Sequence, residues 1–349
     1  MTMTLPIFTD APQRPVFAMG PRSLEAVRLL RLSLTDRCNL RCIYCMPEDG
    51  VAFSDRTDLL SARDILAVAA AGRSAGIDHF KITGGEPTVH RELLSIVRGL
   101  RQLEPLDLSM TTNGLLLDRL AGELKQAGLD RLTISLDTLR PERFTRITGN
   151  RPYTLDQVQD GIRAASAAGF ERLKINVVII GGVNDDEVID FAQLSIDRPW
   201  TIRFIEYMPL GDAKLLENGL KIANSFTVDN AEILHRIERH LGEAEPVDRN
   251  REAGVGPAQL YRLRGANGRI GFISAMSKPF CETCNRLRLT ATGELRACLF
   301  DGGEVDLLPT LRAPGDPVPR IVNQMRQCVA QKPQLHSDRG NRAMSQMGG

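Results

Sequence analysis

The chain has 349 residues, and its 44 lysine and arginine residues nearly balance its 43 aspartate and glutamate residues, so its formal net charge is +1. A chain this close to neutrality has no overall field that would attract nucleic acid or an anionic membrane, and we expect neither as a partner. Its length suits about two domains, or one large α/β barrel with an appendage, and its 42% of hydrophobic residues can bury a core without disulfides.

The N-terminal stretch lacks the basic segment followed by an apolar segment that marks a signal peptide. The apolar runs fall well short of the ~20 residues needed to span a bilayer. We therefore expect a cytoplasmic protein. In that compartment the seven cysteines are expected to be ligands or free thiols rather than disulfides.

In chain order, residues 1–27 form a proline-rich, irregular arm, and a regular alternation follows. Short apolar, β-branched runs predict strands at 29–34, 79–83, 106–112, 131–136, 172–180 and 201–207. Between them lie stretches with the apolar period of a helix, several of which end in glycine, a common helix cap. The alternation favours parallel strands joined by right-handed crossovers.

Six such units are too few for a closed eight-stranded barrel. The predicted fold is therefore α/β, a partial (βα)6 barrel resembling a TIM barrel, with a doubly wound sheet as the alternative that periodicity leaves open. The alternation stops near Met208, and "PLGDAKLLENG" is interpreted as a linker. We predict one domain over residues 1–210 and a second, α+β domain over residues 211–349 that packs on it.

Three cysteines, Cys38, Cys42 and Cys45, follow the first predicted strand, where parallel barrels and sheets place ligand-binding loops. We call them the first cysteine trio. A structural zinc site needs a fourth ligand, and His79 and His90 belong to later units. Three thiolates can instead hold an iron–sulfur cluster with one iron left open. Buried free thiols or part of a zinc ribbon are the alternatives.

The spacing of this trio resembles that of the radical S-adenosylmethionine (SAM) family, whose partial barrels match the predicted alternation. The resemblance implies that SAM chelates the open iron, and that an electron from the cluster breaks a sulfur–carbon bond to give a 5′-deoxyadenosyl radical. It also implies SAM contacts from Tyr44 and Met208 near adenine, from Gly85 in "TGGEP" and from Ser135. Taken singly, each of these residues is as well explained by a turn, a cap or the core.

Three further cysteines, Cys281, Cys284 and Cys298, form a second cysteine trio. The Cys-x2-Cys pair is also common in zinc sites, so spacing alone leaves zinc open. The remaining cysteine, Cys328, falls in a helix-like stretch and is interpreted as a partly buried thiol.

The two trios, "CNRLRLT" and the terminal "MSQMGG" together resemble the GTP 3′,8-cyclase family of molybdenum cofactor biosynthesis, from about Leu29 to Gly349. The resemblance implies a lyase that converts GTP to 3′,8-cyclo-7,8-dihydroguanosine 5′-triphosphate, the first step towards molybdopterin. The adenosyl radical would take hydrogen from C3′ of the ribose, and C3′ would then add to C8. Two [4Fe–4S] clusters are implied, the second on Cys281, Cys284 and Cys298 with guanine at its open iron.

A triphosphate is expected to be held by arginine and lysine, whose charged groups bind phosphate oxygens. Arg286 and Arg288 are two residues apart in a strand-like run and so share one face. By resemblance, the GTP contacts are Arg31, Lys81, Thr111, Lys174, Arg286, Leu287 and Arg288. Thr112 fits nearly as well as Thr111.

The chain ends in Gly348 and Gly349, and terminal residues are usually disordered. The resemblance instead implies that both glycines reach into the active site, where a chain without side chains can thread a crowded pocket. The implied catalytic residues are thus Gly348, Gly349, Arg286 and Arg288.

The expected partners are GTP, SAM, an electron donor and a downstream cyclic pyranopterin monophosphate synthase, with a homodimer left open. The leading alternative is another radical SAM enzyme, such as a peptide-modifying one with auxiliary clusters. It gives no reason for Arg286, Arg288 or the diglycine end. A zinc-stabilised interaction protein would explain only the later cysteines.

Overall fold

The computed structural model describes residues 21–46, 52–210, 226–248, 252, 254–301, 304–337, 342 and 344–348. Most of the predicted N-terminal arm, most of the predicted linker, and Gly349 lie outside the described residues.

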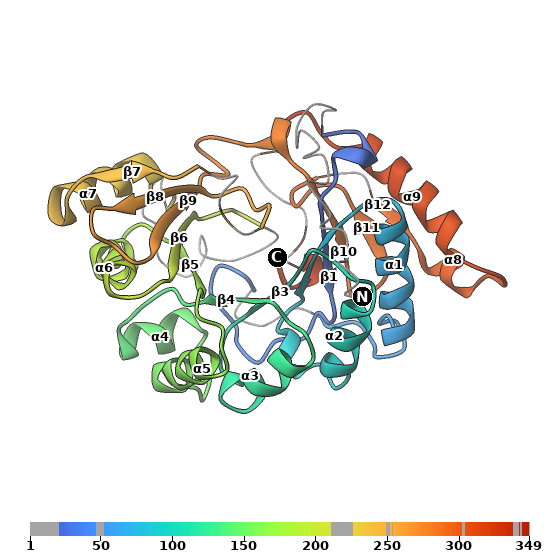
Figure 1. Cartoon of the computed structure of the whole chain (residues 1–349), viewed down its shortest axis with the longest axis horizontal. Helices are drawn as coiled ribbons and strands as arrows, with labels where there is room; N and C mark the ends of the chain where they lie inside the picture. Colours follow the sequence, from blue (N-terminus) through green and yellow to red (C-terminus); the bar gives the residue numbers. More distant parts are fainter. Residues whose placement is uncertain are drawn as a thin grey trace, which may run out of the picture.

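One sheet of twelve strands organises the described part of the chain (Figure 1). The strands are β1 (Leu29–Ser33), β2 (His79–Thr83), β3 (Asp107–Thr112), β4 (Arg131–Ser135), β5 (Lys174–Ile179), β6 (Thr201–Glu206), β7 (Ala244–Pro246), β8 (Gln259–Leu263), β9 (Arg269–Ile273), β10 (Arg286–Leu289), β11 (Glu294–Arg296) and β12 (Glu304–Asp306). Their order is β12-β11-β10-β1-β2-β3-β4-β5-β6-β9-β8-β7. The six strands expected from the alternation are all present, within one or two residues of their predicted ends.

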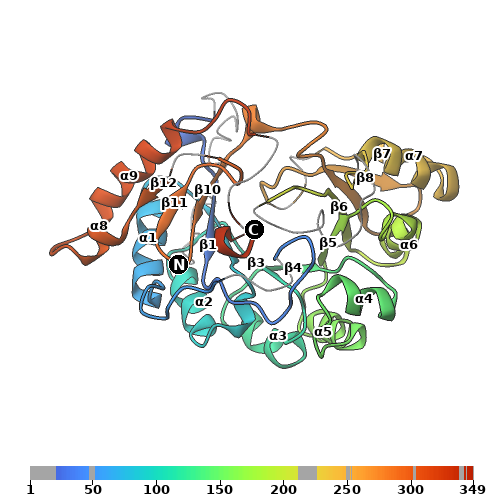
Figure 2. The same cartoon turned by 180° about the vertical axis from the view of Figure 1, so that it is seen from behind.

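Strands β1 to β6 are parallel and follow one another in chain order. A doubly wound sheet reverses its strand order at a switch point, and this sheet does not. The strands curve into an open barrel with helices on the outside, as Figures 1 and 2 show from opposite sides. The predicted partial α/β barrel is therefore confirmed.

The later part of the chain extends both edges of this same sheet. Strand β10 pairs in parallel with β1, and β9 pairs in parallel with β6. Strands β11 and β12 continue antiparallel beyond β10, and β8 and β7 continue antiparallel beyond β9. The second domain predicted over residues 211–349 thus contributes strands on both sides of the barrel opening, and its boundary at residue 210 stays a prediction.

Helices cover the outer face of the sheet. They are α1 (Ala62–Ser74), α2 (Leu93–Arg101), α3 (Leu117–Gln126), α4 (Pro141–Ile147), α5 (Leu155–Ala167), α6 (Val188–Asp197), α7 (Asn230–Leu241), α8 (Leu308–Arg312) and α9 (Val318–Ala330). The short helix α10 (Met344–Met347) lies instead within the curve of the barrel (Figures 1 and 2). Short 3₁₀ turns span Leu24–Ala26, Pro87–Val89, Asp185–Glu187 and Cys281–Thr283. Among the described helices, none is long and apolar enough to cross a membrane.

The helix boundaries follow from local chemistry. Ser61 and Asp64 form a reciprocal capping box at the start of α1, and Thr154 and Gln157 do the same for α5. The sequence pattern missed α4, although Pro141 at its start was an available signal because proline suits the first turn of a helix.

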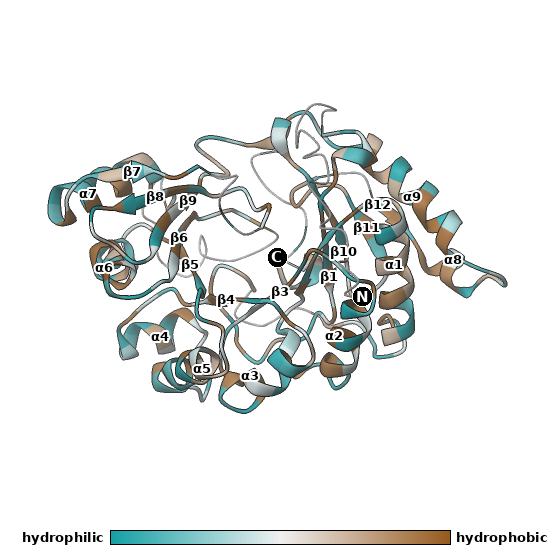
Figure 3. Cartoon of the chain, viewed as in Figure 1, coloured by the Kyte–Doolittle hydropathy of each residue, from teal (hydrophilic) through white to brown (hydrophobic). Residues whose placement is uncertain are grey.

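Successive side chains along a strand alternate between the helix-covered face of the sheet and the inside of the barrel. On β1, Leu30 and Leu32 are fully buried on the helix side, where Leu30 packs near Gly72 of α1. Arg31, between them, faces the inside of the barrel. The helices carry hydrophobic as well as hydrophilic residues, as Figure 3 shows, because one face of each packs on the sheet. The fold therefore leaves polar side chains for the barrel interior.

Candidate active site

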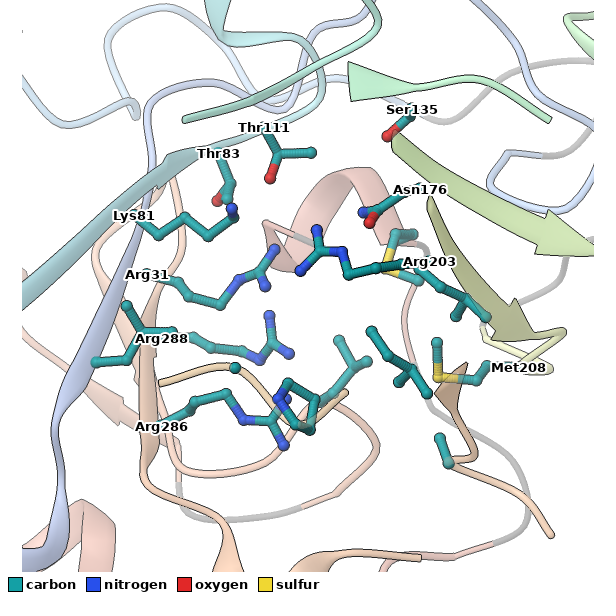
Figure 4. A pocket seen from close by; sticks show the side chains of 18 of the residues that line it. Arg31, Lys81, Thr83, Thr111, Ser135, Asn176, Arg203, Met208, Arg286 and Arg288 are labelled. Carbon is teal, nitrogen blue, oxygen red and sulfur yellow. The ribbon is translucent and has the colours of Figure 1, made fainter. Parts of the chain in front are cut away.

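A cavity of about 320 Å³ lies within the barrel. All six cysteines of the two trios line it, although the trios are far apart in the chain. The other lining residues that the sequence predicted are Tyr44, Gly85, Ser135, Met208, Arg31, Lys81, Thr111, Lys174, Arg286 and Arg288. Nearly the whole predicted site therefore converges on one cavity, part of which Figure 4 shows.

The first cysteine trio lies in the loop after β1. The Cys45 amide donates to the Cys42 carbonyl at 2.8 Å, which makes this a tight turn. Burial, reinforced by Glu86, raises the pKa of the Cys38 thiol to about 11. Burial and Asp137 raise the pKa of Cys42 as well. Because metals bind thiolates, these thiols must release protons when they become ligands.

The "TGGEP" segment after β2 packs directly on this loop. The Gly85 amide donates to the Thr35 carbonyl at 2.6 Å, and a Cβ at Gly85 would lie 2.3 Å from the Arg37 carbonyl oxygen. Only glycine allows this approach. Glu86 is 1% exposed and accepts a hydrogen bond from the Thr112 hydroxyl at 2.6 Å. The segment therefore ties the ends of β1, β2 and β3 together beside the first trio.

The residues predicted to contact SAM all line the cavity, Tyr44 from the loop of the first trio and Met208 from the apolar cluster against which Cys298 also packs. The Tyr44 hydroxyl donates to Asp137 at 2.7 Å, and the Val178 amide donates to the other oxygen of that carboxylate at 2.8 Å. Burial raises the pKa of Asp137 to about 6 despite these bonds. Ser135 and Met208 stand at the edge of the cavity in Figure 4. Asp137 was not singled out from the sequence, although it completes the "SLD" motif.

Three cations stand side by side across neighbouring strands, and we call them the cationic row. Arg288 on β10 is in register with Arg31 on β1, which is in register with Lys81 on β2. Burial and Arg286 lower the pKa of Arg288 to about 10, and burial with the neighbouring arginines lowers the pKa of Arg31 and Lys81. In the described part of the chain, no ion pair involves the row. Unpaired buried cations are costly, so the row is suited to an anionic ligand.

Arg203 on β6 faces the cationic row from the opposite wall, as Figure 4 shows, and it was not among the residues predicted from the sequence. Burial, with Arg131 nearby, lowers its pKa to about 10. Its guanidinium donates to the Thr133 hydroxyl at 3.4 Å, and Lys81 donates to the same hydroxyl at 3.1 Å. The sequence feature that could have identified Arg203 is a charged residue inside the apolar run "TIRFIEY". Arg31 stands in the same way inside the apolar run "LLRLSL".

Among the described residues, three buried side-chain atoms in the cavity wall have no hydrogen-bond partner: the Thr111 hydroxyl, the Asn176 side-chain oxygen and Nε of Arg203. Buried polar atoms are usually bonded, so all three are suited to a ligand. Thr112 also lines the cavity, but its hydroxyl donates to Glu86. Leu287 is also predicted to contact GTP, and its side chain is fully buried in the hydrophobic core. Alternation along β10 directs it away from the face of Arg286 and Arg288.

The second cysteine trio lies in positive surroundings. The Lys332 ammonium, 4% exposed, donates to the Cys284 carbonyl at 2.8 Å and lies 3.8 Å from its sulfur. The Arg286 guanidinium lies 3.7 Å from the same sulfur and stacks over the Phe280 ring. Burial acts to raise the pKa of Cys284, but Arg286 and Lys332 outweigh it and lower the pKa to about 6. This thiol is therefore mostly thiolate at pH 7.

The contrast between the trios predicts different reactivity in the metal-free protein. At pH 7 we expect iodoacetamide to alkylate Cys284 roughly 30- to 90-fold faster than Cys38, because the gain in thiolate exceeds the loss in intrinsic nucleophilicity. The rate at Cys284 should level off above pH 6, where the thiol is already ionised, whereas the rate at Cys38 should keep rising with pH, so the advantage of Cys284 should shrink as the pH is raised above 7. Peptide mapping by mass spectrometry measures both rates, and equal rates would contradict the proposed electrostatic difference.

The C-terminal segment enters the cavity wall. The Gly348 carbonyl accepts hydrogen bonds from Arg288 at 3.1 Å, Thr83 at 3.2 Å and Arg31 at 3.3 Å. Gly348 has φ 67°, and a Cβ there would lie 2.7 Å from the Cβ of Ser33. The short helix α10 therefore delivers a carbonyl oxygen to two members of the cationic row.

Comparisons with known proteins agree with this site. The model of the radical SAM superfamily matches residues 32–195, and that described as Molybdenum Cofactor Synthesis C matches residues 200–338. The crystal structure of Streptococcus suis SuiB bound to S-adenosylmethionine has a TM-score of 0.56 at 14% identity, over 84% of this chain and 64% of that one. At this identity the likeness shows the fold alone. The chain is a radical SAM protein, with SAM and an iron–sulfur cluster as cofactors.

Two relatives identify the family within this superfamily. A GTP 3′,8-cyclase of Geobacter sulfurreducens is 47% identical over 311 residues, 89% of this chain and 91% of the relative. A GTP 3′,8-cyclase of Heliobacterium modesticaldum is 46% identical over 331 residues, 93% of this chain and 98% of the relative. The resemblance drawn from the cysteine trios and the terminal motif is confirmed, and the chain belongs to the GTP 3′,8-cyclase family.

Proposed function

We propose that this chain is a lyase that converts GTP to 3′,8-cyclo-7,8-dihydroguanosine 5′-triphosphate, the first step of molybdenum cofactor biosynthesis. One observation carries the proposal: both cysteine trios and the buried cations line a single cavity. A peptide-modifying radical SAM enzyme would have no use for a row of arginine and lysine side chains that lack carboxylate partners. A nucleoside triphosphate supplies the negative charge that these side chains need.

The second cysteine trio is proposed to hold a second [4Fe–4S] cluster. In the described residues no three His, Cys, Asp or Glu side chains are close enough to share one metal ion. A four-iron cluster does not require that, because each thiolate binds a different iron. The donor set fits: three thiols face one cavity, and Arg286 and Lys332 favour the thiolate form of Cys284. Guanine of GTP would occupy the remaining iron.

Binding of SAM is assigned to the residues at the first trio. The backbone of Gly85 would receive the methionyl amine, Ser135 the carboxylate or ribose, and Tyr44 and Met208 the adenine. Met208 offers a polarisable thioether for stacking. The bond from Tyr44 to Asp137 fixes the orientation of the phenol ring, and the amide of Val178 fixes Asp137 in turn.

GTP is proposed to lie between the second trio and the cationic row. Arg31, Lys81, Lys174, Arg203 and Arg288 would hold the phosphates, and the unbonded hydroxyl of Thr111 is available to the same ligand. Arg286 would lie between the phosphates and the second cluster, because its guanidinium lies 3.7 Å from the Cys284 sulfur. A contact from Leu287 would have to come from its backbone, because its side chain lies in the core.

When bound, SAM and the first cluster would supply the adenosyl radical that takes hydrogen from C3′ of the ribose. The contribution of the chain is to hold C3′ beside C8 and to exclude water, which favours ring closure over side reactions. The tail takes part through Gly348, which contacts Arg31 and Arg288 at the phosphate end. Gly349 is proposed to extend further into the cavity, but it lies outside the described residues.

The function requires partners that the chain must meet outside this cavity. An electron donor has to reduce the first cluster, and a cyclic pyranopterin monophosphate synthase has to take the product onward. A homodimer, the cytoplasmic location and the division at residue 210 stay predictions.

Anaerobic purification followed by metal and activity assays tests the proposed function. We expect about eight irons per chain with matching sulfide. We also expect 5′-deoxyadenosine to form from SAM together with consumption of GTP. Zinc bound to the second trio would refute the proposal. So would SAM cleavage that proceeds at the same rate with and without GTP.

Arg203, which the sequence analysis missed, offers a sharper test of how the phosphates are held. Arg203→Met removes a buried charged donor, a loss of about 1.5–3 kcal/mol, so KM for GTP should rise roughly 10- to 100-fold. The inhibition constant of GDP should rise less if Arg203 contacts the γ-phosphate. Arg326→Gln, an exposed change on α9, is the charge-matched control and should leave KM unchanged.

A further inference from the structure

The C-terminal segment is fixed to the sheet edge before it enters the cavity. Both guanidinium nitrogens of Arg342 pair with the Glu294 carboxylate of β11, one of them at 3.1 Å, and one also lies 3.4 Å from Glu304 of β12. Glu304 also pairs with the fully buried Arg296. One carboxylate thus receives two arginines, and Arg342 bridges two neighbouring strands. We call Arg342, Glu294 and Glu304 the tail clamp.

Past the clamp, the segment is held at two more points. Met347 of α10 is fully buried in an apolar cluster with Leu210 and Phe300, and Cys298 packs against that cluster. Gly348 then bonds to Arg31 and Arg288 through its carbonyl. The red helix α10 lies within the curve of the barrel in Figures 1 and 2.

The hydrogen bonds from Arg31 and Arg288 to the Gly348 carbonyl cannot by themselves keep the tail in place. Arg31 and Arg288 are also the proposed ligands of the triphosphate, so the tail carbonyl and the substrate share donors. The tail clamp uses neither of these two arginines. Its members Arg342, Glu294 and Glu304 are not among the residues that line the cavity. An anchor outside the cavity can hold the tail in register while the arginines change partners.

We propose that Arg342 is a positioning residue whose clamp with Glu294 and Glu304 holds the C-terminal tail so that Gly348 reaches the cationic row. The proposal rests on the role given to Gly348 in the proposed function. Arg342 acts through the tail and touches no reacting atom. It also links the tail to β11, the strand that directly precedes Cys298 of the second trio.

The clamp is suited to opening and closing rather than to permanent attachment. The side chains of Arg342, Glu294 and Glu304 are 34%, 28% and 32% exposed. Ion pairs with this exposure are weak and are screened by salt. The tail can therefore leave to admit substrate or release product, and the strength of the clamp sets the fraction of chains with the tail in place.

Variants of the clamp, prepared as the anaerobic holoprotein, test the proposal. Arg342→Gln and Glu294→Gln each remove the bidentate pair, whereas Arg342→Lys keeps the charge without the fork. Arg326→Gln is the matched control, because it removes an exposed arginine whose guanidinium bonds only to Asn323 of its own helix in the described structure. Hydrogen exchange of the peptide 342–349 reports tail docking, and kcat and KM for GTP report function.

We expect Arg342→Gln and Glu294→Gln to speed exchange of the tail peptide severalfold and to lower kcat about two- to fivefold. KM for GTP should change less than twofold, and Arg342→Lys should recover much of the loss. The differences in exchange rate and kcat between these variants and the parent protein should become smaller as the salt concentration rises, because salt screens the ion pairs of the parent clamp.

Exchange and kcat equal to those of Arg326→Gln would overturn the proposal. So would a loss of kcat that follows a loss of iron, because that would indicate a merely structural role. Hydrogen exchange needs no turnover, so it tests the clamp even if the chain proved to lack cyclase activity. Faster exchange without product from the parent protein would refute the proposed function and leave the clamp intact.

Discussion

Replacing Cys38 with alanine is expected to abolish 5′-deoxyadenosine formation and GTP consumption together. The cofactor supplies the difficult chemistry, so a first trio with two thiolates leaves a chain that binds substrate without converting it. Iron should fall by about half, to roughly four irons per chain, because the second trio is unaffected. Iron, sulfide and 5′-deoxyadenosine are measured on the anaerobic protein.

A change in the second trio separates the roles of the two sites. Cys298→Ala should retain about four irons and should lose the cyclised product, because guanine loses its proposed anchor. SAM cleavage that no longer depends on GTP would then be the expected residual activity. If Cys38→Ala still cleaved SAM, the assignment of the radical source to the first trio would be wrong.

Cys328→Ala is the matched control for these cysteine variants. Cys328 is fully buried in α9, and burial raises the pKa of its thiol to about 12, so it is expected to be inert. The substitution should cost about 1 kcal/mol of folding stability and leave iron and turnover unchanged. The sequence indicated a partly buried thiol at Cys328, and in the structure its side chain is fully buried.

Gly348→Ala is expected to lower kcat roughly 30- to 1000-fold while leaving both iron sites loaded. At φ 67°, an alanine is strained by about 1–2 kcal/mol. Its Cβ would also lie 2.7 Å from the Ser33 Cβ and 2.9 Å from the Thr83 hydroxyl, an overlap that costs about 1–2 kcal/mol more. A total of about 2–4 kcal/mol against the docked tail corresponds to the stated loss.

Gly315→Ala provides the control for backbone strain. Gly315 has φ 86°, and no atom lies within 4 Å of the position of its Cβ. The substitution carries a similar backbone cost at a distance from the tail, so it should lower the melting temperature slightly and leave kcat unchanged. Equal kcat for Gly348→Ala and the parent protein would show that the tail need not dock for turnover.

Strand alternation predicts which face of a strand a side chain lies on, but it does not predict what that side chain contacts. Alternation applied to Arg286 and Arg288 was correct, and the same rule implies that the Leu287 side chain faces the core. Thr111 and Thr112 could not be separated from the sequence, because the difference lies in the bond that Glu86 accepts from Thr112. Arg203 was missed because a single charged residue in an apolar run does not indicate a binding site by itself. Its role becomes apparent only when the structure places it across the cavity from the cationic row.

The fold was predictable where it depends on neighbouring residues. Strand–helix alternation gave the six parallel strands, but the contacts that place β9 and β10 at opposite edges of the barrel join distant parts of the chain. Local patterns contain no information on such pairings, so the later strands were expected in a separate packing domain.

The amino-acid sequence alone determined the two cysteine trios, the alternation and hence the family, because ligand spacing and periodicity are local properties of a chain. Only the tertiary structure decided that Arg288, Arg31 and Lys81 stand in one row, that Gly348 reaches two of them, and that Arg342 is paired with Glu294. These contacts depend on strand register and sheet curvature, which the packing of the whole chain fixes and which no single segment specifies.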